Sequence, residues 1–179
     1  MIRRISIIAA RILLGLFTLV LVFLLVSVIP LRPERNEEAV LGYTFSLKAA
    51  QALNLDWREA YNAALSDLEP AVIRIPVYWD LIEPQQGVYD WTLFDEQLRL
   101  LEGTDTQVIL AIGHKLPRWP ECHIPSWAST FDKGQSQAAV LAMLEAVTVH
   151  YRSHPSVVGW QVENESLFPF GDCPDWSND

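Results

Sequence analysis

The chain has 179 residues, with 13 basic and 22 acidic side chains and a formal net charge of −9. This charge excludes a typical nucleic-acid-binding protein, because neutralising phosphates requires clustered positive charge, and no nucleic acid partner is expected. Residues 36–179 hold 21 of the acidic side chains and all seven tryptophans. The sequence therefore predicts an acidic, tryptophan-rich globular part behind a hydrophobic N-terminal segment.

The N-terminal segment carries no charge over residues 12–29. As a helix, this run would cover roughly 27 Å, close to the hydrocarbon thickness of a bilayer. A cleaved signal peptide is the alternative, but the run exceeds the usual h-region and lacks a small-residue cleavage site. The sequence predicts a transmembrane signal-anchor over residues 1–30, with membrane contact through residues 5–29, and a linker over residues 31–40. Arginines before the span favour a single-pass protein with an extracytoplasmic globular part.

Beyond the linker, short β-type runs alternate with helix-periodic stretches, which is the pattern of βα units around a parallel sheet. Four strands are predicted, at Leu41–Ser46, Ala71–Val77, Gln107–Gly113 and Val157–Glu165. Three helices are predicted between them, one starting at Asp56, one starting at Thr92 and one over about Gln137–Tyr151. The first two starts resemble capping boxes, because Glu59 and Asp95 follow three residues later.

The fourth predicted strand has one apolar and one polar face. Val158, Trp160 and Val162 alternate with Gln161, Glu163 and Glu165. A doubly wound sheet is covered by helices on both faces and would be apolar throughout. The polar face therefore favours a barrel interior, where functional groups follow the carboxyl ends of the strands.

Three polar side chains fall near the ends of different predicted strands: Arg74, His114 and Glu165. Each alone is more often structural, but three strand ends that deliver such groups together predict a site at one rim. Glu165 is the strongest candidate, because it follows Asn164 and precedes a loop rather than a helix. The loops of this rim add the aromatic residues Tyr78, Trp79, Tyr89, Trp91, Trp119 and Trp127. Such rings suit stacking on the C–H faces of a sugar, although about half are expected to serve packing.

Three stretches together resemble the first half of a clan A glycoside hydrolase: Ala71–Trp91, Val108–Trp119 and His154–Glu165. The most specific pieces are WxxxEPxxGxxDW, from Trp79 to Trp91, and GWQVENE, from Gly159 to Glu165. The closest resemblance is to the β-galactosidases of family 42, with the cellulase-like families next. It implies an α/β fold in which residues 41–179 form the first four βα units of a TIM (β/α)8 barrel, since a whole barrel needs roughly 250 residues.

The resemblance implies that Glu165 is the general acid/base and that Asn164 holds the sugar 2-hydroxyl group. It also implies that Arg74 steadies the region of the nucleophile and that His114 lines the subsite next to the cleaved bond. Trp79 and Trp119 are the further predicted contacts with an oligo- or polysaccharide β-glycoside. Family 42 usually has Asp where this chain has Glu163, which leaves the identity of the sugar open.

In clan A the nucleophile is a glutamate at the end of the seventh strand, and only four strands are predicted here. The expectation is therefore the N-terminal portion of a retaining glycosidase, without the nucleophile strand and inactive alone. Two alternatives are a membrane-tethered carbohydrate-binding remnant without hydrolysis and a half-barrel completed by another chain.

The two cysteines, Cys122 and Cys173, fall in the loops after the third and fourth predicted strands. Outside the cytoplasm, a disulfide between them is predicted, worth roughly 4 kcal/mol in the chain-entropy account. A zinc site that combines them with His114 or His123 is the alternative, although no close ligand pair such as Cys-x2-Cys occurs. Neither a metal nor another cofactor is expected.

Overall fold

A computed structural model describes residues 2–28 and 40–173, and the chain divides into two compact units, residues 1–39 and 40–179. The first unit contains one helix, α1 (Ile2–Val28). Within the described residues, no helix is long and apolar enough to cross a membrane, and the predicted span over residues 5–29 is not supported. The predicted linker, residues 31–40, lies outside the described residues except for Val40.

The second unit contains a four-stranded parallel sheet. Its strands are β1 (Gly42–Thr44), β2 (Val72–Pro76), β3 (Gln107–Ile112) and β4 (Val157–Val162). Each strand pairs with the next one along the chain, so that the order in the sheet is β1-β2-β3-β4. This sequential order is that of a (β/α)8 barrel, whereas a doubly wound sheet reverses direction at a switch point. The four predicted strands are confirmed, with ends one to three residues shorter.

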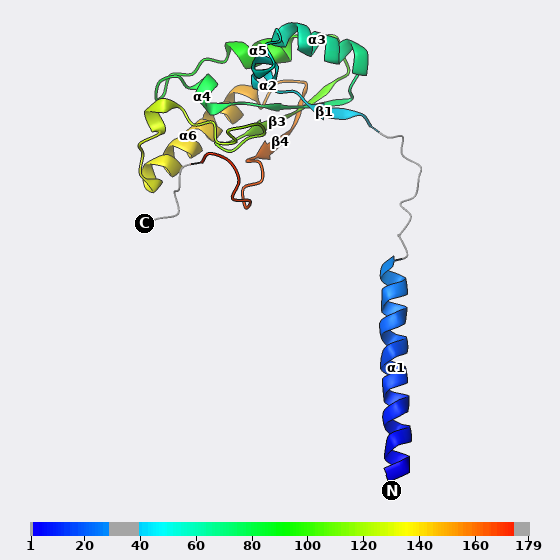
Figure 1. The fold of residues 1–179 in the computed structure, drawn as a ribbon. Coiled ribbons are helices and arrows are strands. Elements are labelled where there is room, and N and C mark those ends of the chain that lie inside the picture. The colour runs from blue at the N-terminus through cyan, green and yellow to red at the C-terminus, as the bar shows by residue number, and fades with distance from the viewer. Residues whose placement is uncertain (1, 29–39, 174–179) are drawn as a thin grey trace. The chain divides into compact units, whose positions relative to one another are not determined.

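Helices separate the strands, and α2, α3 and α5 lie together on one side of the sheet (Figure 1). The helices of this unit are α2 (Leu47–Ala52), α3 (Trp57–Leu68), α4 (Trp79–Ile82), α5 (Thr92–Arg99) and α6 (Lys133–Tyr151), with a 3-10 turn at Ser126–Ala128. The three predicted helices are α3, α5 and α6. The sequence analysis missed α2, α4 and the 3-10 turn, because each is too short to show a helical period.

The helix starts follow local hydrogen bonding. Asp56 caps α3, because its side chain accepts hydrogen bonds from the backbone N–H groups of Arg58 and Glu59. This confirms the predicted start of the helix but shows only the N-cap half of the predicted capping box. The predicted capping box at Thr92 is wrong, since α5 has no side-chain cap and Asp95 instead accepts a hydrogen bond from His150. A capping box formed by Asp132 and Gln135 starts α6 four residues earlier than predicted.

One hydrophobic core fills the space between the sheet and the helices. Ile73 and Ile75 of β2 and Leu110 and Ile112 of β3 are buried there. They pack with helix residues that include Tyr61, Phe94, Leu98, Met143 and Val147. In β4, Trp160 pairs with Leu110 and Val162 pairs with Ile112, so both continue this apolar face to the edge of the sheet. The opposite face of the sheet carries the polar groups described next.

Candidate active site

A chain of polar side chains crosses the sheet on the face away from the helices. Arg74 of β2 donates from Nε to Thr44 Oγ1 of β1 (2.8 Å) and from Nη1 to Gln161 Oε1 of β4 (2.8 Å). Gln161 Nε2 then donates to Asn164 Oδ1 (3.2 Å), just beyond the end of β4. One arginine therefore links the first, second and fourth strands. Because Oδ1 of Asn164 accepts the bond from Gln161, the side-chain amide nitrogen of Asn164 is the atom that can donate to a bound hydroxyl group.

Glu163 joins the end of β4 to the end of β3. Its carboxylate accepts hydrogen bonds from the backbone N–H of His114 (3.1 Å), from His114 Nδ1 (2.8 Å) and from the backbone N–H of Lys115 (2.7 Å). A carboxylate only accepts, so Nδ1 of His114 carries the proton. Gly113, at φ +140°, makes room for the carboxylate, because a Cβ at this position would lie 2.5 Å from Glu163 Cδ. Glu163 thus fixes the imidazole of His114 at the rim.

Glu165 lies on the loop that follows β4, and its side chain is exposed. Its backbone oxygen accepts a hydrogen bond from Nζ of the buried Lys115 (3.1 Å), which also binds the backbone oxygen of Phe168. Glu163 and Glu165 both have positive φ values, 61° and 50°. This backbone conformation is unfavourable for non-glycine residues, and residues that adopt it are often found at functional sites. The segment from Glu163 to Glu165 is therefore a candidate functional segment.

Trp79, predicted as a substrate contact, does not lie at the rim. Its side chain is 0% exposed and packs edge-on against Trp127, with ring centroids 5.6 Å apart. Its Nε1 donates to Glu83 Oε2 (2.6 Å), and Glu83 Oε1 accepts a hydrogen bond from the backbone of Gly87 (2.7 Å). The WxxxEPxxG motif therefore folds a helical turn and its following loop against the core, rather than presenting a ring to a ligand.

Trp119 is exposed, and its ring lies 6.1 Å from that of Phe170. Nearby, Cys122 and Cys173 form a disulfide with a Cα–Cα distance of 5.1 Å, which connects the loops after β3 and β4. Both sulfurs are used in this bond, so neither is a thiolate ligand for zinc here. Across the described residues, no three His, Cys, Asp or Glu side chains are arranged to hold a metal ion.

A partly buried polar cluster lies behind the rim, where the segments that follow the first three strands meet. Lys48 Nζ contacts Asp80 Oδ2 (2.5 Å) and His123 Nδ1 (3.0 Å), and Tyr78 shares a hydrogen bond with Ser46 (2.6 Å). Burial and the adjacent Lys48 ammonium lower the pKa of His123 to about 4, so this imidazole is neutral near pH 7. Burial raises the pKa of Tyr78 to about 12. These contacts connect the segments that follow the first three strands, although Oδ1 of Asp80 has no hydrogen-bond partner among the described residues.

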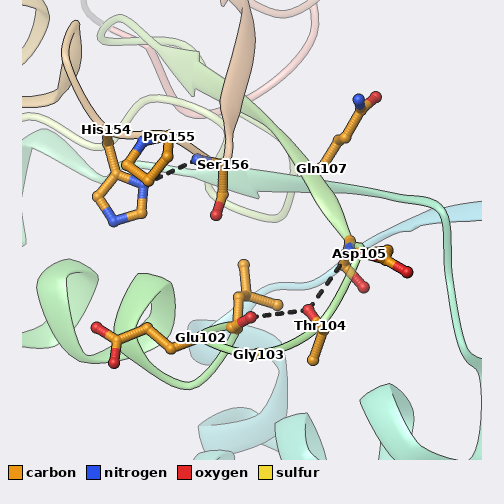
Figure 2. Close-up of a pocket in the computed structure, with 10 residues that line it drawn as sticks. Glu102, Gly103, Thr104, Asp105, Gln107, His154, Pro155 and Ser156 are labelled. Atoms are coloured by element: carbon orange, nitrogen blue, oxygen red, sulfur yellow. Dashed lines mark hydrogen bonds between the residues drawn. The ribbon is translucent and has the colours of Figure 1, made fainter.

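A hollow lies at the amino ends of β3 and β4, at the opposite end of the strands from the rim, and Figure 2 shows the residues that line it. Residues 101–107 and 154–156 form it. Several of its polar groups bind each other: Thr104 Oγ1 donates to the backbone oxygen of Leu101 (2.8 Å), and the backbone N–H of Ser156 donates to His154 Nδ1 (3.3 Å) (Figure 2). Sites in barrels of this kind lie at the carboxyl ends of the strands, which favours the rim.

Comparison with known proteins points to the same family as the motifs. Residues 57–137 match the family model described as β-galactosidase, glycoside hydrolase family 42. The predicted resemblance to the family 42 glycoside hydrolases is confirmed. The match covers α3 through the start of α6, and it includes the strand ends that carry Arg74 and His114.

Two curated proteins are similar to this chain over part of their length. Endo-1,4-beta-xylanase C of Phanerodontia chrysosporium is 31% identical over 128 residues, which cover 67% of this chain and 29% of the xylanase. The β-galactosidase Bga of Halorubrum lacusprofundi is 25% identical over 121 residues, which cover 58% of this chain and 17% of that protein. The chain thus spans less than a third of the length of these relatives.

Solved structures agree on the fold. An exo-β-1,4-mannosidase from Opitutaceae bacterium strain TAV5 superposes with a TM-score of 0.55 at 20% identity, covering 73% of this chain and 25% of that chain. The four parallel strands therefore match part of the TIM barrel of a glycoside hydrolase.

Two positions of the rim, Lys115 and Gly113, are not predicted from the sequence. A lysine after a strand is usually a solvated side chain, and the role of Gly113 depends on a carboxylate 50 residues away. The sequence does contain one indication of these two positions, the triplet Gly113-His114-Lys115 directly after a buried strand. A glycine at such a place often marks the close approach of another part of the chain.

Proposed function

We propose that residues 40–173 supply the acid/base side of a retaining β-glycoside hydrolase site, with Glu165 as the proton donor. The observation that carries this proposal is the position of Glu165, an exposed carboxylate on the loop after β4. It follows Asn164, whose side-chain oxygen Oδ1 accepts a hydrogen bond from Gln161. The names of the similar proteins, a β-galactosidase and an endo-1,4-β-xylanase, support a β-glycoside as the class of substrate.

The chemistry assigns one task to each rim residue. Glu165 protonates the oxygen of the leaving group, and Asn164 donates a hydrogen bond to a hydroxyl group of the sugar beside the bond that breaks. Arg74 holds Gln161 and, through it, Asn164. His114, fixed by Glu163, lines the same sugar. The roles of Arg74, Asn164 and His114 are positional, because hydrogen bonds orient these three side chains before a substrate arrives.

A retaining hydrolase also needs a nucleophilic carboxylate about 5–5.5 Å from the acid/base group. Three other motif carboxylates are engaged: that of Glu163 accepts three hydrogen bonds, that of Glu83 is buried against Trp79, and that of Asp90 accepts a hydrogen bond from the backbone N–H of Thr92. We assign the nucleophile to a carboxylate outside residues 40–173.

Glu165→Ala, tested in a protein that also contains the nucleophilic carboxylate, is expected to slow the hydrolysis of alkyl β-glycosides by about a hundredfold or more, because an alkoxide leaves poorly without a proton. The same variant should cleave 2,4-dinitrophenyl β-glycosides at nearly the wild-type rate, since that phenolate needs no proton to leave. Measuring kcat/KM for both classes of glycoside on the two proteins gives the comparison. Azide is expected to restore turnover of the variant and yield the glycosyl azide.

Glu102→Ala is the matched control, because Glu102 is an exposed carboxylate in the hollow of Figure 2, at the other end of the strands. It should leave both rates unchanged. Equal losses for Glu165→Ala on both classes of glycoside, or no loss on either, would contradict the role of Glu165.

Carbohydrate binding without hydrolysis is the second candidate function, and the exposed ring of Trp119 favours it. It predicts that a protein which also contains the nucleophilic carboxylate binds β-linked oligosaccharides in calorimetric titrations but does not cleave even the dinitrophenyl glycosides.

A further inference from the structure

Three exposed aromatic side chains lie together beside the candidate acid/base residue. Trp119, Phe168 and Phe170 are 67%, 58% and 49% exposed. The rings of Trp119 and Phe170 are 6.1 Å apart, and so are those of Phe168 and Phe170. We call these three side chains the aromatic shelf. Trp119 comes from the loop after β3, and the two phenylalanines come from the loop after β4.

The two loops that carry the shelf are fastened to each other. The Cys122–Cys173 disulfide closes one side, and the backbone N–H of Asp172 donates to the oxygen of Pro120 (2.9 Å). Gly171, at φ +107°, permits this close approach, because a Cβ there would lie 2.8 Å from the Pro120 oxygen. At the other side, the buried Lys115 ammonium binds the backbone oxygen of Phe168. The shelf is therefore built on a held backbone.

This fastening keeps the rings in solvent. Burying an exposed aromatic ring lowers the free energy, and a loose loop would achieve this by folding its rings inward. Here the backbone hydrogen bonds of Asp172 and Phe168 and the disulfide hold the loop in place. Clustered, exposed apolar side chains on a rigid support mark a binding surface.

The position of the shelf relative to Glu165 indicates the occupant. The backbone N–H of Phe168 donates to the backbone oxygen of Glu165 (2.9 Å), so one tight turn connects the carboxylate to the shelf. A shallow hollow lined by residues 165–168 joins them. In the proposed function, Glu165 delivers its proton to the oxygen that leaves, and therefore the group attached to that oxygen lies on the side of Glu165. Aromatic faces bind the C–H faces of a sugar ring.

We propose that the aromatic shelf binds the sugar on the leaving-group side of the scissile bond, and that the protein therefore selects β-linked di- and oligosaccharides over simple alkyl glycosides. This inference rests on the proposed function for the direction of the substrate. The binding of a second sugar ring, however, is measurable without hydrolysis.

Calorimetric titration of the full chain tests the shelf. The probes are four β-1,4-linked disaccharides, of galactosyl-, xylosyl-, mannosyl- and glucosyl-type, each paired with the methyl β-glycoside of its terminal sugar. The wild-type protein is expected to bind at least one disaccharide more tightly than the paired methyl glycoside. Trp119→Ala and Phe170→Ala should each weaken that disaccharide about tenfold and leave the methyl glycoside unchanged.

Leu141→Ala is the matched control, because Leu141 is an exposed apolar side chain of α6 that belongs to no shelf, and it should change neither affinity. Unchanged disaccharide affinity in both shelf variants, or equal weakening of the methyl glycoside, overturns the proposal, and so does a wild-type protein that binds no disaccharide. The test is separate from that of Glu165: shelf variants without effect, together with a Glu165→Ala variant that behaves as expected, would remove the shelf and keep the proposed function.

Discussion

Trp79→Ala is expected to lower the free energy of unfolding by about 3–5 kcal/mol, the range found for large-to-small changes of buried aromatic residues. The indole ring is fully buried, and its removal leaves a cavity beside Trp127. It also takes away the N–H group that donates to the buried carboxylate of Glu83. Urea denaturation followed by far-ultraviolet circular dichroism measures the change.

Trp119→Ala is the matched control for this substitution, because it removes the same side chain from an exposed position. Its free energy of unfolding should stay within about 0.5 kcal/mol of the wild-type value. If the two tryptophan variants were equally stable, Trp79 would not be the core residue that the structure shows. If Trp79→Ala weakened sugar binding without loss of stability, its prediction from the sequence as a substrate contact would be restored.

The double variant Cys122→Ser/Cys173→Ser is expected to lose about 4 kcal/mol of unfolding free energy. The disulfide joins residues 51 positions apart, and removing a cross-link of this loop length restores that much conformational entropy to the unfolded chain. Denaturation of the oxidised wild-type protein and of the variant, without reductant, measures the difference.

Reductant supplies the control for the disulfide. It should lower the stability of the wild-type protein to that of the double variant and have no effect on the variant itself. A loss under 1 kcal/mol, or a further loss on reducing the variant, would contradict a stabilising cross-link between Cys122 and Cys173.

The regular elements were predictable because their signals are local. β2 and β3 are runs of β-branched and apolar residues, and the alternation in β4 placed Gln161 on the face opposite Trp160 before any pairing was known. The missed α2 and α4 have six and four residues, so neither spans two full turns in which a period could appear. The early start of α6 depends on Asp132, and a cap is visible in sequence only once the helix boundary is suspected.

The site was predictable to the extent that parallel strands bring their carboxyl ends to one edge. Arg74 and Asn164, 90 positions apart, are connected through Gln161 as that rule requires. Trp79 and Trp119 show where the rule ends, because both tryptophans follow strands, yet one is buried and the other exposed. Which way a loop folds is decided by tertiary contacts such as the bond from Trp79 to Glu83, and composition does not reveal them.

Titration of the ¹⁵N-labelled full chain with a β-1,4-linked disaccharide, followed by amide NMR, measures most directly where carbohydrate binds. A sugar held at the carboxyl ends of β3 and β4 is expected to shift the amide signals of the non-proline residues within 114–119 and 163–170 and to leave those of the rest of the sheet unchanged. Shifts confined to residues 101–107 and 154–156, the hollow of Figure 2, would place the ligand at the wrong end of the strands and contradict the proposed site.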